Sequence, residues 1–576
     1  MQEYLTTADR SSVLTPQPAL AFAPETPGDA GPVIRIDPKQ SFQSIEGFGY
    51  TLTGGSADLL MQMSPERRHA LLEELFGKRS GDLNISELRL TIGASDMVRQ
   101  LYTYDDMPFG RTDPELRHFS LAPDRQSILP VMHEILAIRP DLHIMASPWT
   151  CPSWMKKGIS HGSRDFLSGD SRRILMAFLF LLAGLTVTAL AVRGRRWTAS
   201  AIIVATSLVV LFTAECLLGL LFLLRDHPFH RTHGHVTGDF LNVMQDDDMW
   251  PKGRLNPVYI GRDAQMAGGM IHVLAAYTAS VLWLHASDNH TTRSGMLAPR
   301  YYDAYARYLV RYFQAMQQEG IPIESMTIQN ESEENFNNPS LAWNAEQQRL
   351  FVANSLGPEL QRAGLKTRII IYDHNADHIA FPEHILADPA AARFIDGSAF
   401  HLYAGSLENL SKMHEAYPAK NIYFTEQMVI EDTRNGVPWP ATEPIRRIAI
   451  GALRNWSRDL ILWNLASDSE AGPHILEGGC RTCLGAITID GDHVERHLGY
   501  ITLAHVSRFV PSGSVVIASN DTMPSGLGNV AFRTPDSGYA LLVTNEGPAQ
   551  GFRIVCEGRE VRATLPHNAA ATFTWN

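Results

Sequence analysis

The sequence is poor in cysteine. Its 576 residues include only five cysteines, too few for a disulfide framework. Cys480 and Cys483 form a CxxC pair, but the sequence has no second pair to complete a zinc site, and no redox-type βαβ pattern surrounds this one. The pair therefore indicates either a local disulfide or two unpaired thiols.

Positive charge and a leader segment are also lacking. The 49 Lys and Arg residues are outnumbered by 61 Asp and Glu, and a net charge of -12 argues against a role in binding nucleic acid. Residues 1–30 contain neither a basic start nor an apolar stretch, so no cleavable signal peptide is expected. The length predicts two or three domains, and a composition with 45% hydrophobic residues is that of a folded globular protein.

Two stretches of the chain alternate short β-rich runs with amphipathic helices. A helix is expected at Pro65–Phe76, with Ser64 as N-cap and Gly77 after its end, and another at Asp303–Gln318. Repeated alternation of this kind predicts a parallel sheet, either a closed barrel or a doubly wound one. The expected strands are Ser86–Leu90, His143–Ser147, Ser325–Ile328, Arg368–Tyr372, Ser398–His401, Ile422–Phe424 and Leu460–Trp463.

The last part of the chain has a different pattern. From about Thr502 onward it alternates apolar and polar residues between turns, as in Ala540–Thr544, Phe552–Val555 and Ala571–Trp575. This predicts an antiparallel β-domain. The early run Val33–Ile36 is expected to join the same sheet.

Two long apolar runs interrupt the first pattern. Ile174–Val192 has 19 residues without a charge, and Ala199–Leu224 has 26 residues interrupted only by Glu215. Each run is long enough to span a bilayer, so we predict a transmembrane hairpin with its Arg193–Arg196 loop on the cytoplasmic side. The alternatives are two buried helices, a third span at Met270–Leu284, or a segment acquired by fusion or rearrangement.

Several histidines follow these runs. Such a cluster can bind zinc, but a polar stretch beside a membrane is the commoner explanation, and no metal is predicted. The residues are His227, His230, His233 and His235, close to Asp226 and Asp239.

Two glutamates follow two of the expected strands. Glu331, preceded by Asn330, comes after Ser325–Ile328, and Glu426 comes after Ile422–Thr425. Barrels present their reactive groups at the C-terminal ends of strands, and retaining glycosidases use two carboxylates about 5 Å apart. Either glutamate alone would be read as a salt-bridged loop residue, but the two together indicate hydrolysis of glycosidic bonds.

Seven motifs lie in order along the chain. They are Glu46–Gly49, Leu88–Gly93 with Ser95 and Asp96, Ala146–Thr150 with Pro152–Lys156, Thr327–Glu331, Phe400–Tyr403, Phe424–Gln427 and Leu462–Ala466. Together they resemble glycoside hydrolase family 30, the family of glucosylceramidases and β-1,6-glucanases. The resemblance is absent from about residues 158–297.

The resemblance implies an α/β fold: a (β/α)₈ TIM barrel with a β-sandwich built from both chain ends. The limits expected are 1–45 for the N-terminal strands of the sandwich, 46–157 and 298–490 for the barrel, 158–297 for an insert carrying the membrane hairpin (174–192 and 199–224), and 491–576 for the rest of the sandwich.

The resemblance also implies roles for individual residues. Glu331 is expected to be the acid/base on the fourth strand and Glu426 the nucleophile on the seventh. Arg89 is expected to keep Glu426 ionised, Asn330 to donate to the sugar 2-hydroxyl, and Tyr403 to donate to Glu426. The full set of expected substrate-binding residues is Arg89, Asp96, Trp149, Asn330, His401, Tyr403 and Trp463, where a purely structural role is the alternative for His401.

The expected function is hydrolysis of β-glucosidic bonds with retention, by a glucosylceramidase-like β-glucosidase that needs no cofactor. The alternatives are an endo-β-1,6-glucanase and, in another class, a membrane-anchored inactive barrel that binds carbohydrate. The expected partner is a β-glucoside or β-glucan. Since the insert follows the third strand, on the catalytic face, it would turn the active site toward a bilayer and favour a glycolipid substrate. The barrel is thus expected at a membrane, on its extracytoplasmic side.

Overall fold

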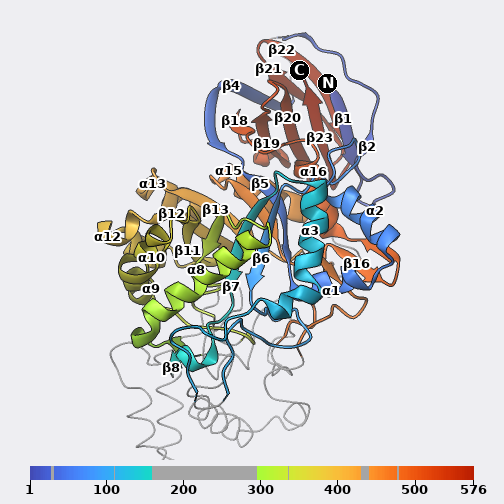
Figure 1. Cartoon of the computed structure of the whole chain (residues 1–576). Coiled ribbons are helices and arrows are strands. Elements are labelled where there is room, and N and C mark those ends of the chain that lie inside the picture. Colours follow the sequence, from blue (N-terminus) through green and yellow to red (C-terminus); the bar gives the residue numbers. More distant parts are fainter. Residues whose placement is uncertain (27–30, 109–110, 158–294, 335–336, 430–439, 476–478) are drawn as a thin grey trace, which may run out of the picture. The chain divides into compact units, whose positions relative to one another are not determined.

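The computed structural model describes residues 1–26, 31–108, 111–157, 295–334, 337–429, 440–475 and 479–576 (Figure 1). The chain divides into one unit formed by Met1–Lys156 with Asn289–Asn576, and a second formed by Lys157–Asp288. The account below concerns the first unit.

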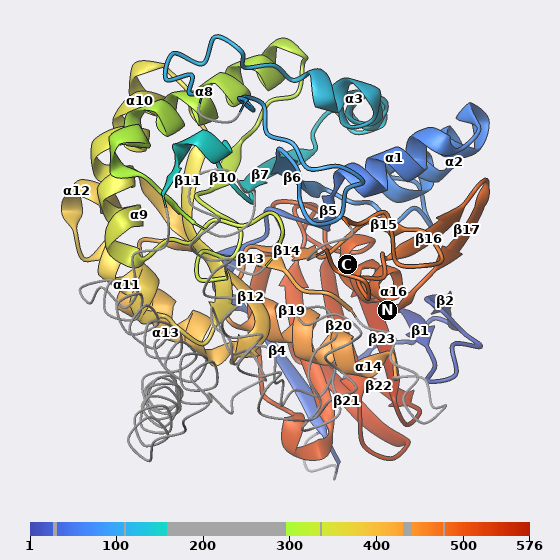
Figure 2. The same cartoon turned by 90° about the horizontal axis from the view of Figure 1, so that it is seen from below.

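Eight parallel strands form the central sheet, in the order β13-β12-β11-β10-β7-β6-β5-β14 (Figure 2). The outer strands β13 and β14 meet through a parallel bridge between Ile422 and Ser457, and the Phe424 amide donates to Asp459 Oδ1 at 2.6 Å. The sheet is thus a closed barrel and not a doubly wound one. Its strands are β5 (Gly47–Leu52), β6 (Glu87–Ile92), β7 (His143–Pro148), β10 (Ser325–Thr327), β11 (Arg368–Ala376), β12 (Ile395–Gly405), β13 (Asn421–Glu426) and β14 (Asp459–Leu462).

Helices connect these strands around the barrel. The helix α2 has the predicted bounds, Pro65–Phe76, and α8 (Tyr302–Gln318) begins one residue before the prediction. Ser64 precedes α2 with an extended backbone, but its side chain makes no capping bond. The other helices are α1 (Gly54–Gln62), α3 (Ile128–Ile138), α9 (Ala345–Phe351), α10 (Gly357–Arg362), α11 (Ala380–Leu386), α12 (Pro389–Ala392), α13 (Glu408–Ala416), α14 (Thr442–Pro444), α15 (Gly451–Arg454) and α16 (Leu498–Ser507).

Shorter helical turns complete the connections. The π-helical turns are η6 (Val352–Leu356) and η8 (Ile445–Ile450), and the 3₁₀ turns are η1 (Ala122–Gln126), η2 (Ser153–Met155), η5 (Pro299–Tyr301) and η9 (Met523–Ser525).

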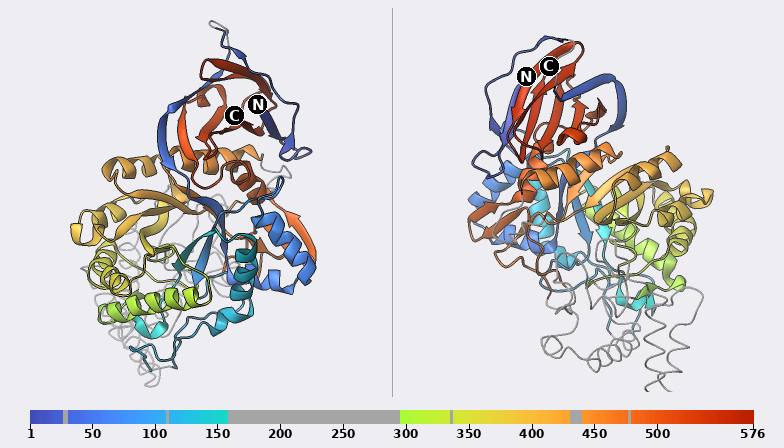
Figure 3. Two further views of the ribbon diagram at one scale, coloured as in Figure 1. Left: turned by 45° about the horizontal axis from the view of Figure 1, so that its top comes forward. Right: turned by 180° about the vertical axis from the view of Figure 1, so that it is seen from behind.

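The ten-stranded second sheet combines both chain ends, in the order β2-β1-β23-β20-β19-β18-β4-β21-β22-β3 (Figure 3). As predicted, the run beginning at Val33 joins this sheet, because β4 pairs antiparallel with β18 and parallel with β21. Its strands are β1 (Gln2–Thr6), β2 (Thr15–Pro16), β3 (Ala23–Pro24), β4 (Val33–Ser44), β18 (Val515–Ser519), β19 (Leu527–Arg533), β20 (Tyr539–Asn545), β21 (Gln550–Cys556), β22 (Arg559–Leu565) and β23 (Ala569–Trp575).

The alternating β-pattern does not begin where it was expected. Thr502, where the alternating pattern was expected to begin, lies inside the helix α16. Every residue of α16 is buried, so no polar face marks it as a helix in the sequence. Before it, the strands β15 (Ala466–Ser467), β16 (Ile487–Asp490) and β17 (His493–Arg496) form a separate small sheet.

The chain leaves and re-enters the barrel at adjacent points. The short strands β8 (Lys156–Lys157) and β9 (Met296–Leu297) pair with each other, and the Ala298 amide donates to the Met155 carbonyl at 3.0 Å. Within the described residues no helix is long and apolar enough to cross a membrane. The predicted spans Ile174–Val192 and Ala199–Leu224, and the histidines that follow them, lie outside those residues.

Ile34 tests the contribution of β4 to the sandwich. Its side chain is fully buried in the core of that domain, so Ile34→Ala should lower the free energy of unfolding by about 3 kcal/mol, measured by chemical denaturation. Lys39→Ala, at an exposed position of the same strand, should change it little. Equal effects of the two substitutions would contradict the assignment of β4 to this core.

Candidate active site

Two glutamates approach each other at the C-terminal end of the barrel. Glu331 follows the fourth strand, β10, and Glu426 is the last residue of the seventh, β13. Carboxylate oxygens of both, with a ring nitrogen of His401, all lie within 4.8 Å of one another. This is close to the separation of about 5 Å that retaining glycosidases use. Inverting glycosidases use a wider gap between their two carboxyl groups.

The backbone at Glu331 is held in an unusual conformation. Its φ of 50° is left-handed, which costs a residue with a side chain about 1–2 kcal/mol. The Glu331 amide donates to the Asp373 carbonyl at 2.8 Å, and the Asn337 side chain donates to Glu331 Oε2 at 3.1 Å. One bond holds the backbone of Glu331 and the other holds its carboxylate, so together they fix the direction of the side chain.

Arg89, on β6, connects the residues of the site. Its guanidinium is fully buried and donates to Glu426 Oε2 at 2.7 Å, to Asn330 Oδ1 at 2.6 Å and to Asp373 Oδ2 at 2.8 Å. Burial raises the pKa of Glu426 overall, while His401 and Arg89 act in the opposite direction. Arg89 therefore has the contact with Glu426 that the sequence predicted, but burial has the larger effect on the pKa.

Asp373, on β11, was missed in the sequence. Its fully buried carboxylate accepts hydrogen bonds from Arg89, from Thr327 and Thr425 at 2.6 Å each, and from His401 Nε2 at 3.1 Å. Burial alone would raise its pKa, but Arg89 and these hydrogen bonds outweigh burial and hold the pKa well below the usual range. Asp373 directly follows the predicted strand Arg368–Tyr372, so the signal that pointed to Glu331 and Glu426 was present here too.

His401, on β12, lies between the carboxylates. Its Nε2 faces Asp373, and its Nδ1 is 3.3 Å from Glu331 Oε1 and 3.9 Å from Glu426 Oε1. Burial would lower the pKa of the imidazole, but Glu426, Asp373 and Glu331 together raise it to about 9. At neutral pH His401 is therefore an imidazolium whose two N–H groups each point to a carboxyl group, that of Asp373 and that of Glu331.

Tyr403, also on β12, contacts the second glutamate. Its hydroxyl donates to Glu426 Oε1 at 3.1 Å and accepts from the Met428 amide at 3.1 Å. Glu426 therefore receives one donor on each oxygen, from Tyr403 and from Arg89. The predicted contact between Tyr403 and Glu426 is present.

Aromatic rings and a disulfide line one side of the site. Trp149 and Trp463 lie with ring centroids 5.5 Å apart, in an apolar cluster with Met97, Met428 and the bonded pair Cys480–Cys483. Of the two alternatives left open for Cys480 and Cys483, the structure has the local disulfide, and the Cys480 amide donates to Asp96 Oδ2 at 3.3 Å. Burial, with Glu426 nearby, raises the pKa of Asp96 to about 7. The structure thus brings together all nine residues that the sequence analysis singled out.

Family comparisons cover most of the chain. The model described as "Glycosyl hydrolase family 30 TIM-barrel domain" matches residues 45–177 and 242–510, and that described as "Glycosyl hydrolase family 30 beta sandwich domain" matches residues 513–573. The barrel match extends into the insert expected at 158–297 and leaves residues 178–241 unmatched.

Individual relatives have similar lengths. Endo-1,6-beta-D-glucanase BGN16.3 of Trichoderma harzianum is 24% identical, over 95% of this chain and 88% of that protein. Lysosomal acid glucosylceramidase of Mus musculus is 22% identical, over 89% and 77%. The solved structure of "the endo-beta1,6-glucanase BT3312" is 27% identical, with a TM-score of 0.71, and the match covers 100% of this chain and 98% of that one.

Asp373→Asn tests the electrostatics of this cluster. Removing the anion beside Nε2 should lower the pKa of His401 from about 9 toward the ordinary value of 6.5, measured by NMR titration of protein with ¹⁵N-labelled histidine. Since the folded pKa is the higher one, the stability contributed by His401 is complete below pH 6.5 and is lost as the pH rises through about 9. The variant should lose less stability over this range than the wild type.

Thr425→Val is the matched control. It removes one hydrogen bond to Asp373 but leaves the charge, so the pKa of His401 should stay close to 9. An unchanged titration of His401 in Asp373→Asn would contradict the assigned cause.

Proposed function

The chain belongs to glycosyl hydrolase family 30, and from this premise we propose that it is a retaining endo-β-1,6-glucanase with Glu426 as nucleophile and Glu331 as acid/base. The observation that carries the mechanism is the approach of the two carboxylates, with His401, within 4.8 Å. A catalytic pair this close leaves no room for the water that an inverting enzyme activates between its carboxyl groups.

The relatives support a glucan substrate more than the glucosylceramide that the sequence first favoured. Three relatives named endo-1,6-beta-D-glucanase are each 24% identical to the chain, and the solved endo-β-1,6-glucanase is 27% identical over 98% of its length. The mouse glucosylceramidase is 22% identical. The expectation of a glycolipid also depended on a membrane hairpin, and those residues lie outside the described part of the chain.

In the first step, a Glu426 oxygen attacks the anomeric carbon and the bond from that carbon to the leaving oxygen breaks. Glu331 gives its proton to the leaving oxygen, and a glycosyl ester forms on Glu426. In the second step, Glu331 takes a proton from water, the water oxygen attacks the same carbon, and Glu426 is released as a carboxylate. Arg89 and Tyr403 hold the two Glu426 oxygens in position for the attack.

The charges in the site favour this division of roles. Two cations, Arg89 and His401, lie beside two buried anions, Asp373 and Glu426. The double displacement needs Glu331 to hold its proton in the first step, while Glu426 attacks as the carboxylate. Once Glu426 is an ester it carries no charge, and the surplus of positive charge then favours the carboxylate form of Glu331, which is the base that the second step needs.

Asn330 and the tryptophans supply sugar contacts. Because Asn330 Oδ1 accepts from Arg89, the amide is oriented with Nδ2 as the end that can donate to the sugar 2-hydroxyl. Trp149 and Trp463 offer flat apolar surfaces for a sugar ring beside Asp96, whose carboxyl can exchange hydrogen bonds with hydroxyl groups.

Substrate preference is the first test. The purified full chain, incubated with linear β-1,6-glucan, linear β-1,3-glucan and detergent-dispersed glucosylceramide, should cleave only the first at a high rate. Early products, separated by chromatography, should be oligosaccharides of many lengths, because internal bonds are cut. Glucose as the sole early product, or faster hydrolysis of glucosylceramide, would contradict an endo-glucanase and favour the exo-acting glucosylceramidase type.

The roles of the two glutamates are tested by substitution. Glu426→Gln should lower kcat on β-1,6-glucan by about 10⁴-fold or more, since the nucleophile is lost. Glu331→Gln should lower it by about 10²–10⁴-fold, with a smaller loss on an aryl glycoside whose leaving group needs little protonation. Glu333→Gln is the matched control, because Glu333 binds His378 instead, and should retain activity.

Covalent labelling identifies the nucleophile independently. A 2-deoxy-2-fluoro glycoside with a good leaving group should label Glu426 once per chain, detected by peptide mass spectrometry. Label on another residue, or no label in an enzyme that is active, would contradict the proposed nucleophile.

A further inference from the structure

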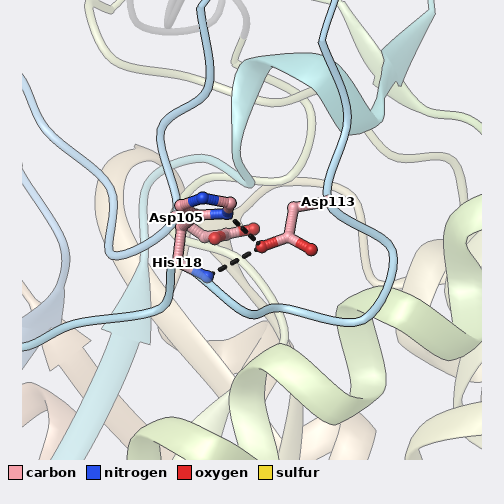
Figure 4. Close-up of side chains that lie close together, drawn as sticks. All are labelled: Asp105, Asp113 and His118. Atoms are coloured by element: carbon pink, nitrogen blue, oxygen red, sulfur yellow. Dashed lines mark hydrogen bonds and ion pairs between the residues drawn. The ribbon is translucent and has the colours of Figure 1, made fainter.

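The loop between β6 and α3 crosses the catalytic face of the barrel and brings three possible metal ligands together. Asp105, Asp113 and His118 come from different parts of this loop, and the close-up view shows their side chains gathered at one point (Figure 4). One donor atom from each lies within 4.8 Å of the others. The same loop begins with Ser95 and Asp96, so its conformation affects the sugar site.

Asp105 is the unusual member of the cluster. Only 1% of its surface is exposed, and neither of its carboxylate oxygens has a hydrogen-bond partner among the described residues. The nearby Trp154 side chain donates instead to the Asp105 backbone carbonyl, at 2.9 Å. A buried carboxylate without donors is strongly unfavourable in a folded protein. A cation at this point would compensate the charge of the Asp105 carboxylate.

Asp113 and His118 do not balance the charge of Asp105. The side chain of Asp113 is also nearly buried, and its Oδ2 accepts from the backbone amide and from Nδ1 of His118, at 2.8 Å each. Two carboxylates thus face a single imidazole, which is 65% exposed and open to water. The cluster lacks positive charge but has an open side from which an ion and water ligands can enter.

We propose that Asp105, Asp113 and His118 form a binding site for a divalent transition-metal ion of the zinc type. Two carboxylates and one imidazole match the mixed oxygen and nitrogen ligands of such ions, whereas calcium and magnesium prefer oxygen alone. The ion would supply the charge that Asp105 lacks. It would also cross-link the loop from residue 105 to residue 118, with water completing the coordination.

A second group of residues has the same donor types, so the test must separate the two. Glu331, His401 and Glu426 also lie within 4.8 Å of one another. There, however, Arg89, Asp373 and Tyr403 already bond to these side chains. Variants in each group distinguish binding at the loop from binding at the sugar site.

The test is isothermal titration calorimetry of the chelator-treated full chain with zinc chloride. The wild type should bind one zinc ion per chain more tightly than calcium. Asp105→Asn and His118→Gln should each weaken zinc binding at least about tenfold, because each removes a ligand. Glu426→Gln should keep the wild-type affinity, as should His69→Gln, a control in which an exposed histidine that pairs with Glu73 is replaced.

Thermal unfolding provides a second readout. Zinc should raise the Tm of the wild type by about 2 °C or more and leave that of His118→Gln unchanged. Since His118 is exposed, this variant tests the proposal even if Asp105→Asn does not fold. The proposal is overturned if zinc does not bind the wild type, if calcium binds more tightly, or if binding is lost in Glu426→Gln but kept in His118→Gln.

Discussion

A single buried cation holds the site together. Arg89 extends from β6 and bonds to Ser147 on β7, Asn330 after β10, Asp373 on β11 and Glu426 on β13. A guanidinium with no exposure to water is costly unless it is hydrogen-bonded, and here each of its three nitrogens donates, to two carboxylates, an amide oxygen and a hydroxyl in all. The positions of the strand ends, and with them the reacting groups, therefore depend on this one side chain.

Charge balance follows from that arrangement. Asp373 lies between Arg89 and His401 and keeps both cations close to Glu331 and Glu426, the proposed catalytic pair. Without Asp373, the two cations would face Glu331 and Glu426 alone. In the proposed mechanism Asp373 itself touches no substrate. Through the two cations it affects the protonation of Glu331 and Glu426, which do.

Much of the barrel was predictable because buried parallel strands appear as short apolar runs with polar residues at their ends. The first strand, Gly47–Leu52, was not identified as a strand, because two glycines dilute its apolar pattern. Gly49 is required there by close packing: a Cβ atom would lie 1.7 Å from the Glu87 carbonyl oxygen. Asp373 has the same place at a strand end as the two glutamates, but what distinguishes it is its four partners on other strands. The helix α16 was missed because burial on all sides removes the helical period. Such features arise from tertiary contacts that a local pattern does not contain.

The strands β8 and β9 pair with each other at the points where the chain leaves and re-enters the barrel. Lys157 and Met296 stand on neighbouring strands, so the ring of β7 and β10 closes whatever the length of the connection. The family barrel model leaves only residues 178–241 of that connection unmatched. A change in length is therefore best placed within those residues, since the paired strands β8 and β9 keep the two ends of the connection together.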